Sequence, residues 1–217
     1  MIGFNEIEKF DRAEPSQFLK NDGQNKIGIN LQKLIVAGGP LNDINDIARM
    51  WQYFMKKLKR DKDNKIKKFT RTSEEIVTSK IWSGCSDVGT VFATILRANN
   101  IPTIYLQGAN IDWVNDLVLK NDKKNSVRGH IFLEIFLNDE WLLFDPTNGY
   151  IYPNYDFNNL SLPQKCYAFS KSLNGHEVGA INLDKNNEIM TNLFKKFDIK
   201  KYKNPNYKEI DLRSVIN

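Results

Sequence analysis

Thiols and imidazoles, which act as nucleophile and base near neutral pH, are scarce in this chain: it has two cysteines and two histidines in 217 residues. Cys85 stands at the polar edge of the stretch "SGCSDVGTVFATILRANNIP", where the apolar spacing predicts that a helix begins. His130 opens the apolar run "HIFLEIFL", and Asp145 closes the next one, "EWLLFD". A thiol, an imidazole and a carboxylate are the parts of a nucleophilic acyl-transfer site, provided that the fold brings them together.

The two apolar runs predict a β-hairpin with Asn138 and Asp139 as its turn residues. Side chains alternate faces along a strand, so His130 and Asp145 would share one face as diagonal neighbours, about 7–8 Å apart at the backbone. An imidazole and a carboxylate can bridge that distance. A four-residue loop would preserve this parity, whereas a three-residue loop would place the two residues on opposite faces.

The predicted position of Cys85 suits a thiolate. The first turn of a helix has unpaired N–H groups and the positive end of the helix dipole, which stabilise a negative sulfur and a developing oxyanion. A nearby imidazolium would lower the thiol pKa further. Asp87, two residues on, is expected to support the helix start and to take no part in the chemistry.

Each of these residues also has a common structural role: a packed thiol, a surface imidazole or a turn carboxylate. A second interpretation is metal binding, because all three are acceptable zinc ligands by type. Their spacing matches no closed zinc motif, and the chain contains neither CxxC nor HExxH. We therefore expect no metal and no cofactor.

Local patterns predict the elements around these residues. Residues 41–60 have helical spacing, and Thr72 with Glu75 has the spacing of a capping box that opens a short helix ending near residue 82. Residues 103–108 read as a buried strand, residues 109–129 as a long polar loop and residues 1–40 as irregular. The remainder, 150–217, is expected to add strands and a short helix.

The composition indicates one compact domain, with a helical lead-in over residues 1–69 packed on a core over residues 70–217. Two cysteines point to a reducing compartment, and the first residues show no signal-peptide pattern. No apolar run is long enough to span a membrane, so a cytoplasmic location is expected. The net charge of +5 comes from scattered lysine groups without a nucleic-acid motif.

The segments around Cys85, His130 and Asp145 resemble the transglutaminase-like superfamily. "SGCSDVGTVFATILRANNIPT" is similar to its cysteine segment, and "GHIFLEIFLNDEWLLFDPT" to its histidine and aspartate segment. The order and spacing of the three residues agree as well, and the likeness covers roughly residues 70–150. It implies an α+β, papain-like core in which the cysteine helix packs on an antiparallel sheet or small barrel.

The resemblance also implies roles for these residues. Cys85 would be the nucleophile, His130 the general base and acid, and Asp145 the partner that orients the imidazole. Trp82 is a weak candidate for an oxyanion helper and Trp113 for a substrate-lining residue, although tryptophans at such places are more often packing residues. Cys166 and His176 match nothing in the pattern and are expected to be structural.

Thioester chemistry on a carboxamide, peptide or protein substrate follows from the resemblance. The alternatives are hydrolysis by a peptidase or amidase, which we favour slightly, and transamidation to an amine. A third is a non-catalytic module that uses the fold to bind protein. No calcium loop is visible, and the sequence leaves the substrate and the oligomeric state open.

Overall fold

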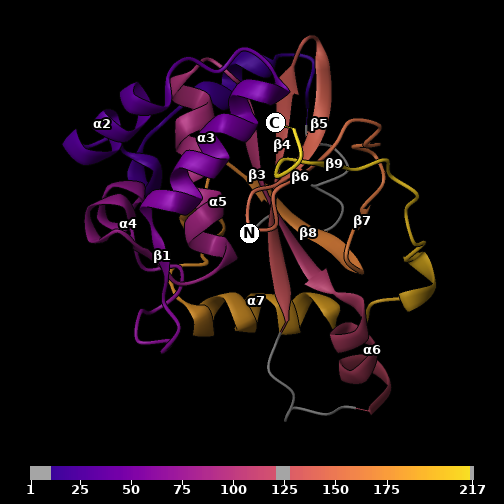
Figure 1. The fold of residues 1–217 in the computed structure, drawn as a ribbon. Coiled ribbons are helices and arrows are strands. Elements are labelled where there is room, and N and C mark those ends of the chain that lie inside the picture. Colours follow the sequence, from indigo (N-terminus) through magenta and orange to yellow (C-terminus); the bar gives the residue numbers. More distant parts are fainter. Residues whose placement is uncertain (1–10, 121–127, 216–217) are drawn as a thin grey trace.

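The computed structural model describes residues 11–120 and 128–215. A group of four helices packs on one face of an antiparallel sheet (Figure 1): α2 (Ile29–Gly38), α3 (Ile44–Lys57), α4 (Ser73–Ser79) and α5 (Cys85–Ala98). Helices α6 (Ile111–Lys120) and α7 (Leu183–Phe194) pack with side chains of the opposite face. Short 3-10 segments cover Pro15–Leu19, Gly23–Asn25, His176–Val178 and Ile199–Lys201.

The main sheet has seven strands, each antiparallel to its neighbours. In sheet order they are β7 (Ser161–Leu162), β8 (Cys166–Ser172), β3 (Thr103–Asn110), β4 (Gly129–Leu137), β5 (Glu140–Asp145), β6 (Tyr150–Tyr152) and β9 (Ile210–Asp211). A small parallel pair, β1 (Lys59–Arg60) and β2 (Ile81–Trp82), lies before α5. The predicted α+β class, with the cysteine helix on an antiparallel sheet, is confirmed. The boundary at residue 69 stays a prediction.

The hairpin of β4 and β5 has the predicted register. Leu133 faces Phe144 and Leu137 faces Glu140. The turn residues Asn138 and Asp139 have φ values of 52° and 63°, as in the type I′ turns whose twist matches paired strands. The parity that places His130 and Asp145 on one face is therefore correct.

Helix α5 is the central helix of the core. Its buried Phe92 packs edge-on against Phe54 of α3 at 5.1 Å and against Phe144 of β5 at 5.5 Å between ring centroids. Gly89 lets the first turns lie very close to the sheet, because a Cβ there would stand 2.5 Å from Ile131 Cγ2. The start of α5 is thus held against the start of β4.

Two sequence predictions are wrong. Residues 1–40 are not wholly irregular, since α2 spans Ile29–Gly38, and residues 111–120 of the predicted polar loop form helix α6. The helical face of α6 consists of Ile111, Val114 and Leu117, which are buried. Over the longer segment 109–129, the polar residues that follow this face obscure its helical spacing. Residues 121–127, the rest of the predicted loop, lie outside the described residues.

The capping box is confirmed. The Thr72 hydroxyl accepts a hydrogen bond from the Glu75 N–H, and the Glu75 carboxylate accepts one from the Thr72 N–H. The helix that it opens ends at Ser79, earlier than predicted, because Lys80 adopts a left-handed conformation and β2 begins at Ile81.

We predict that Gly89→Ala destabilises the protein although alanine favours a helix by about 1 kcal/mol. The new methyl group must push α5 away from Ile131, and such overpacking costs about 1–3 kcal/mol. Thermal unfolding should show a lower midpoint, and alkylation of Cys85 at neutral pH should slow as the helix start moves. An unchanged or higher midpoint with unchanged alkylation would contradict this close contact.

Candidate active site

Cys85 is the first residue of α5 and is half-buried. Asp87 fixes this helix start: its Oδ2 accepts hydrogen bonds from the Ser83 N–H at 2.7 Å and the Ser83 hydroxyl at 2.8 Å. Arg71 also pairs with this carboxylate. Asp87 therefore supports the helix start, as predicted, and holds the backbone just before the thiol.

His130 lies near the start of β4, between the other two residues. Its Nε2 is 2.9 Å from Asp145 Oδ1. Its remaining ring nitrogen, Nδ1, is the one left for the hydrogen bond that it makes with Cys85. The N–H of Ile131 also donates to the Cys85 sulfur. The structure thus brings the three predicted residues together in one hydrogen-bonded series.

The carboxylate of Asp145 is fully buried and held on both oxygens. Oδ1 accepts from the N–H groups of Thr147 and Asn148, each at 3.1 Å. Oδ2 accepts from the Asn148 side-chain amide at 2.9 Å and from the Gln164 side-chain amide. This clamp directs Oδ1 toward His130.

Sequence reasoning missed Asn148 and Gln164. The segment "DPTNG" contains a signal for Asn148, because a turn asparagine so close to an aspartate can reach its carboxylate. Gln164 gives no such signal. It lies in the turn between β7 and β8 at φ 58°, and only the pairing of those strands with the rest of the sheet brings it near Asp145.

The electrostatics of the three residues favour a charged pair. Burial opposes ionisation of Asp145, but the hydrogen bond and charge of His130, with the bonds from Asn148, keep its pKa below the usual value. Burial also opposes a charged His130, yet its bonds to Asp145 and Cys85 raise its pKa. For Cys85, burial is outweighed by the hydrogen bond and charge of His130, so the thiol pKa is lowered. All three shifts act in the direction that favours a thiolate–imidazolium pair.

A cavity of about 90 Å³ opens beside the thiol. Its walls come from α5, from β3 and β4, from the segment before α4, and from α7, which crosses the end of the sheet (Figure 1). The lining includes Cys85, Ser86, Gln107, His130 and Asn186. This small space suits one substituent of a substrate better than a whole ligand.

Gln107 of β3 is the notable polar residue in this lining. It is 1% exposed, and within the described part of the chain neither its amide nitrogen nor its amide oxygen has a hydrogen-bond partner. Ser86 is also buried, at 2% exposure, and its hydroxyl likewise has no hydrogen-bond partner among the described residues. Buried polar groups without partners are costly, and in native proteins they often mark a place for water or a ligand. No motif or residue spacing in the sequence points to Gln107.

The two tryptophans lie elsewhere. Trp82 is half-buried in β2, with the Arg60 guanidinium 5.5 Å from its ring centre. Trp113 is buried in α6 and packs edge-on against Phe194 of α7. Neither belongs to the cavity lining. Their suggested helper roles stay predictions without a contact that supports them.

The remaining cysteine and histidine have structural surroundings. Cys166 is free and buried, and burial raises the pKa of its thiol to about 12. His176 Nε2 lies 2.6 Å from the Phe69 carbonyl oxygen. Over residues 11–120 and 128–215, no three His, Cys, Asp or Glu side chains are grouped so that they could hold a metal ion. No helix in that part of the chain is long and apolar enough to cross a membrane.

Comparison with known proteins agrees with this fold and site. The sequence profile of the transglutaminase-like superfamily matches residues 33–146, more than half of the chain. The protein therefore belongs to the transglutaminase-like superfamily, a family of cysteine enzymes with a papain-like core. No curated protein matches the sequence.

A solved structure of a candidate cysteine protease from Cytophaga hutchinsonii superposes with a TM-score of 0.51 at 13% identity. The match covers 80% of this chain and 52% of that one, so this chain spans about half the length of the protein to which it is similar. At this identity the likeness supports the fold alone.

We predict that iodoacetamide alkylates Cys85 well below the pH at which an ordinary thiol reacts. Because the folded pKa is lowered, the thiolate persists as the pH falls and is lost only when the pH passes through that lower value. In His130→Gln, Cys85 stays buried but loses the neighbouring positive charge. The pH profile of its alkylation should therefore shift to higher pH, and the alkylation rate at neutral pH should fall about tenfold or more. Mass spectrometry separates Cys85 from Cys166.

The matched control is His176→Gln, which removes the other histidine and should leave the profile in place. Equal profiles for wild type and His130→Gln would show that no imidazolium supports the thiolate.

Proposed function

We propose that the protein is a cysteine-dependent enzyme that cleaves carboxamide or peptide bonds, or transfers their acyl groups, through a thioester on Cys85. The observation that carries the proposal is the hydrogen-bonded series from Asp145 through His130 to Cys85, with a cavity beside the thiol. A thiolate that only packs would need neither a charged partner nor space at the sulfur.

In the first half-reaction, the Cys85 thiolate attacks the carbonyl carbon of the substrate amide, and a C–S bond forms. The imidazolium of His130 then gives its Nδ1 proton to the amide nitrogen as the C–N bond breaks and the amine departs. Asp145 stays ionised. Its bond to Nε2 keeps the ring oriented so that Nδ1 faces the sulfur.

In the second half-reaction, neutral His130 takes a proton from water or from an incoming amine, which attacks the thioester. The C–S bond breaks and the thiolate is restored, with the imidazolium beside it. Water gives hydrolysis and an amine gives transamidation. We favour hydrolysis as the simpler outcome, since water needs no binding site of its own and an amine requires one that excludes water.

The oxyanion needs hydrogen-bond donors on the side of the carbonyl oxygen. The N–H groups of Cys85 and Ser86 can serve there, because an α-helix leaves its first amides without intrahelical partners, whereas the Asp87 N–H already donates to the Gly84 carbonyl oxygen. The second donor that we propose is the Gln107 side-chain amide, which lines the same cavity and is buried without a partner among the described residues. Such a donor, fixed in a buried site, stabilises developing charge strongly.

An acyl-enzyme should be observable by intact-protein mass spectrometry. Incubating the protein with an activated ester of a short peptide acid should add one acyl group to wild type, and hydroxylamine should remove it as the hydroxamate. Cys85→Ser should show no thioester. Failure of wild type to acylate, despite a thiol that alkylates readily, would support the binding-module alternative.

Gln107→Leu should lower the rate of acylation about 100-fold or more if the amide stabilises the oxyanion, and it should leave the pH profile of Cys85 alkylation in place. Gln107→Glu should also be slow above the pKa of the new carboxyl, because a carboxylate donates no hydrogen bond. Circular dichroism would check that both variants fold. Acylation of Gln107→Leu at the wild-type rate would exclude the proposed donor role.

A further inference from the structure

Lys68 lies at the junction of two hollows. It lines the cavity beside Cys85, and it also lines a groove of about 600 Å³ between residues 64–68 and the start of α7. Leu183 is shared by both as well. The cavity and the groove therefore adjoin at Lys68 and Leu183, and a chain whose reactive group occupies the cavity would leave it beside the groove.

This groove is basic. Lys65, Lys67 and Lys68 contribute to its walls, against the single acidic residue Asp184. Lys65 makes an exposed ion pair with Asp63 at 2.9 Å. Within residues 11–120 and 128–215, neither Lys67 nor Lys68 has an ion-pair partner. Two unpaired ammonium groups thus border the path away from the thiol.

The position of Lys68 is electrostatically unusual. Its Cε lies 3.5 Å and its Nζ 4.0 Å from the point where a Cβ of Gly84 would stand, and Gly84 is the cap of α5. Helix N-termini carry positive partial charge and favour anions. The N-terminus of α7 lies on the same groove. Cations and two helix starts converge here, and the structure supplies Asp184 as the only carboxylate of the groove lining.

We propose that this groove binds an acidic stretch of the substrate, and that Lys68 pairs with a carboxylate next to the reactive amide. The proposal rests on the proposed function, since it assigns the substrate class of that site: a peptide with aspartate or glutamate beside the amide. Lys67 pairs with a carboxylate further along. The cavity beside Cys85 takes the reactive group itself, and the basic groove selects what surrounds it.

A pair of small probes tests this assignment at the thiol. Iodoacetate and iodoacetamide react with the same thiolate and differ by one negative charge. We expect Lys68→Gln to lower the ratio of the iodoacetate rate to the iodoacetamide rate at Cys85 about three- to fivefold, the scale of a partly exposed charge pair. Lys68→Arg should keep the wild-type ratio, and added salt should lower it in wild type.

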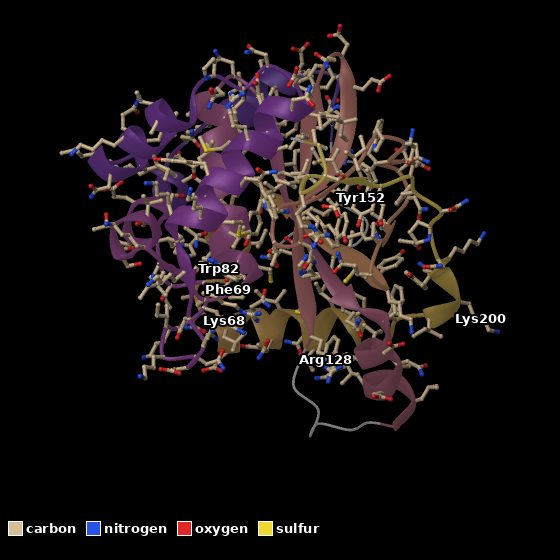
Figure 2. The ribbon with its side chains drawn as sticks, viewed as in Figure 1. Lys68, Phe69, Trp82, Arg128, Tyr152 and Lys200 are labelled. Atoms are coloured by element: carbon tan, nitrogen blue, oxygen red, sulfur yellow. The ribbon has the colours of Figure 1, made fainter. Side chains whose placement is uncertain are left out.

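The matched control is Lys200→Gln. Lys200 is an exposed lysine on the opposite side of the molecule from Lys68 and Trp82 (Figure 2). The Lys200→Gln substitution removes the same charge and should leave the ratio of the iodoacetate rate to the iodoacetamide rate unchanged. Equal ratios in wild type and Lys68→Gln would overturn the role of Lys68. A ratio that falls equally in Lys200→Gln would overturn it too, because net charge alone would then be responsible.

A longer probe tests the groove. A short peptide of glutamates should protect Cys85 of wild type from iodoacetamide better than the same length of glutamines, and Lys67→Gln/Lys68→Gln should lose most of this difference. Equal protection by both peptides would overturn the acidic substrate class. Fast alkylation of Cys85 in the same experiment would still support the proposed thiol chemistry. A Cys85 inert to both reagents would instead remove the proposed function and this inference with it.

Discussion

The buried carboxylate of Asp145 is the constraint on which the site depends. A fully buried negative charge is costly unless it is paired and hydrogen-bonded. Here the N–H groups of its own turn, the amides of Asn148 and Gln164, and the His130 ring supply those bonds. The hydrogen bond and the negative charge of this carboxylate raise the pKa of His130, and the hydrogen bond and charge of His130 in turn lower the pKa of Cys85.

The fold turns this electrostatic chain into a fixed geometry. One hairpin carries both His130 and Asp145, so their distance is set by strand pairing and a two-residue turn. Cys85 comes from a different layer, and Gly89 allows α5 to lie against β4 closely enough for the sulfur to meet the ring. Helix α7 closes one side of the cavity with Asn186 and Met190. A rigid pair of strands and one closely packed helix start thus position the three groups.

Much of this site was predictable because its signals are local. The hairpin register follows from two apolar runs around Asn138 and Asp139, and the helix start at Cys85 follows from apolar spacing. Gln107 and Gln164 were not predictable in the same way: each reaches the site through strand neighbours distant in sequence, and neither has a motif of its own. Helix α6 was missed because its short buried face gives a weak periodicity beside a long polar run.

The most direct measurement of the charged pair is an NMR titration of the histidine rings, which is simple because the chain contains only His130 and His176. If Asp145 and Cys85 hold the proton on His130, its ring stays charged through neutral pH and titrates near pH 10. Cys85→Ala should lower that midpoint, because a negative neighbour is lost. A His130 that titrates near 6.5 in wild type, and does not respond to Cys85→Ala, would contradict the thiolate–imidazolium pair.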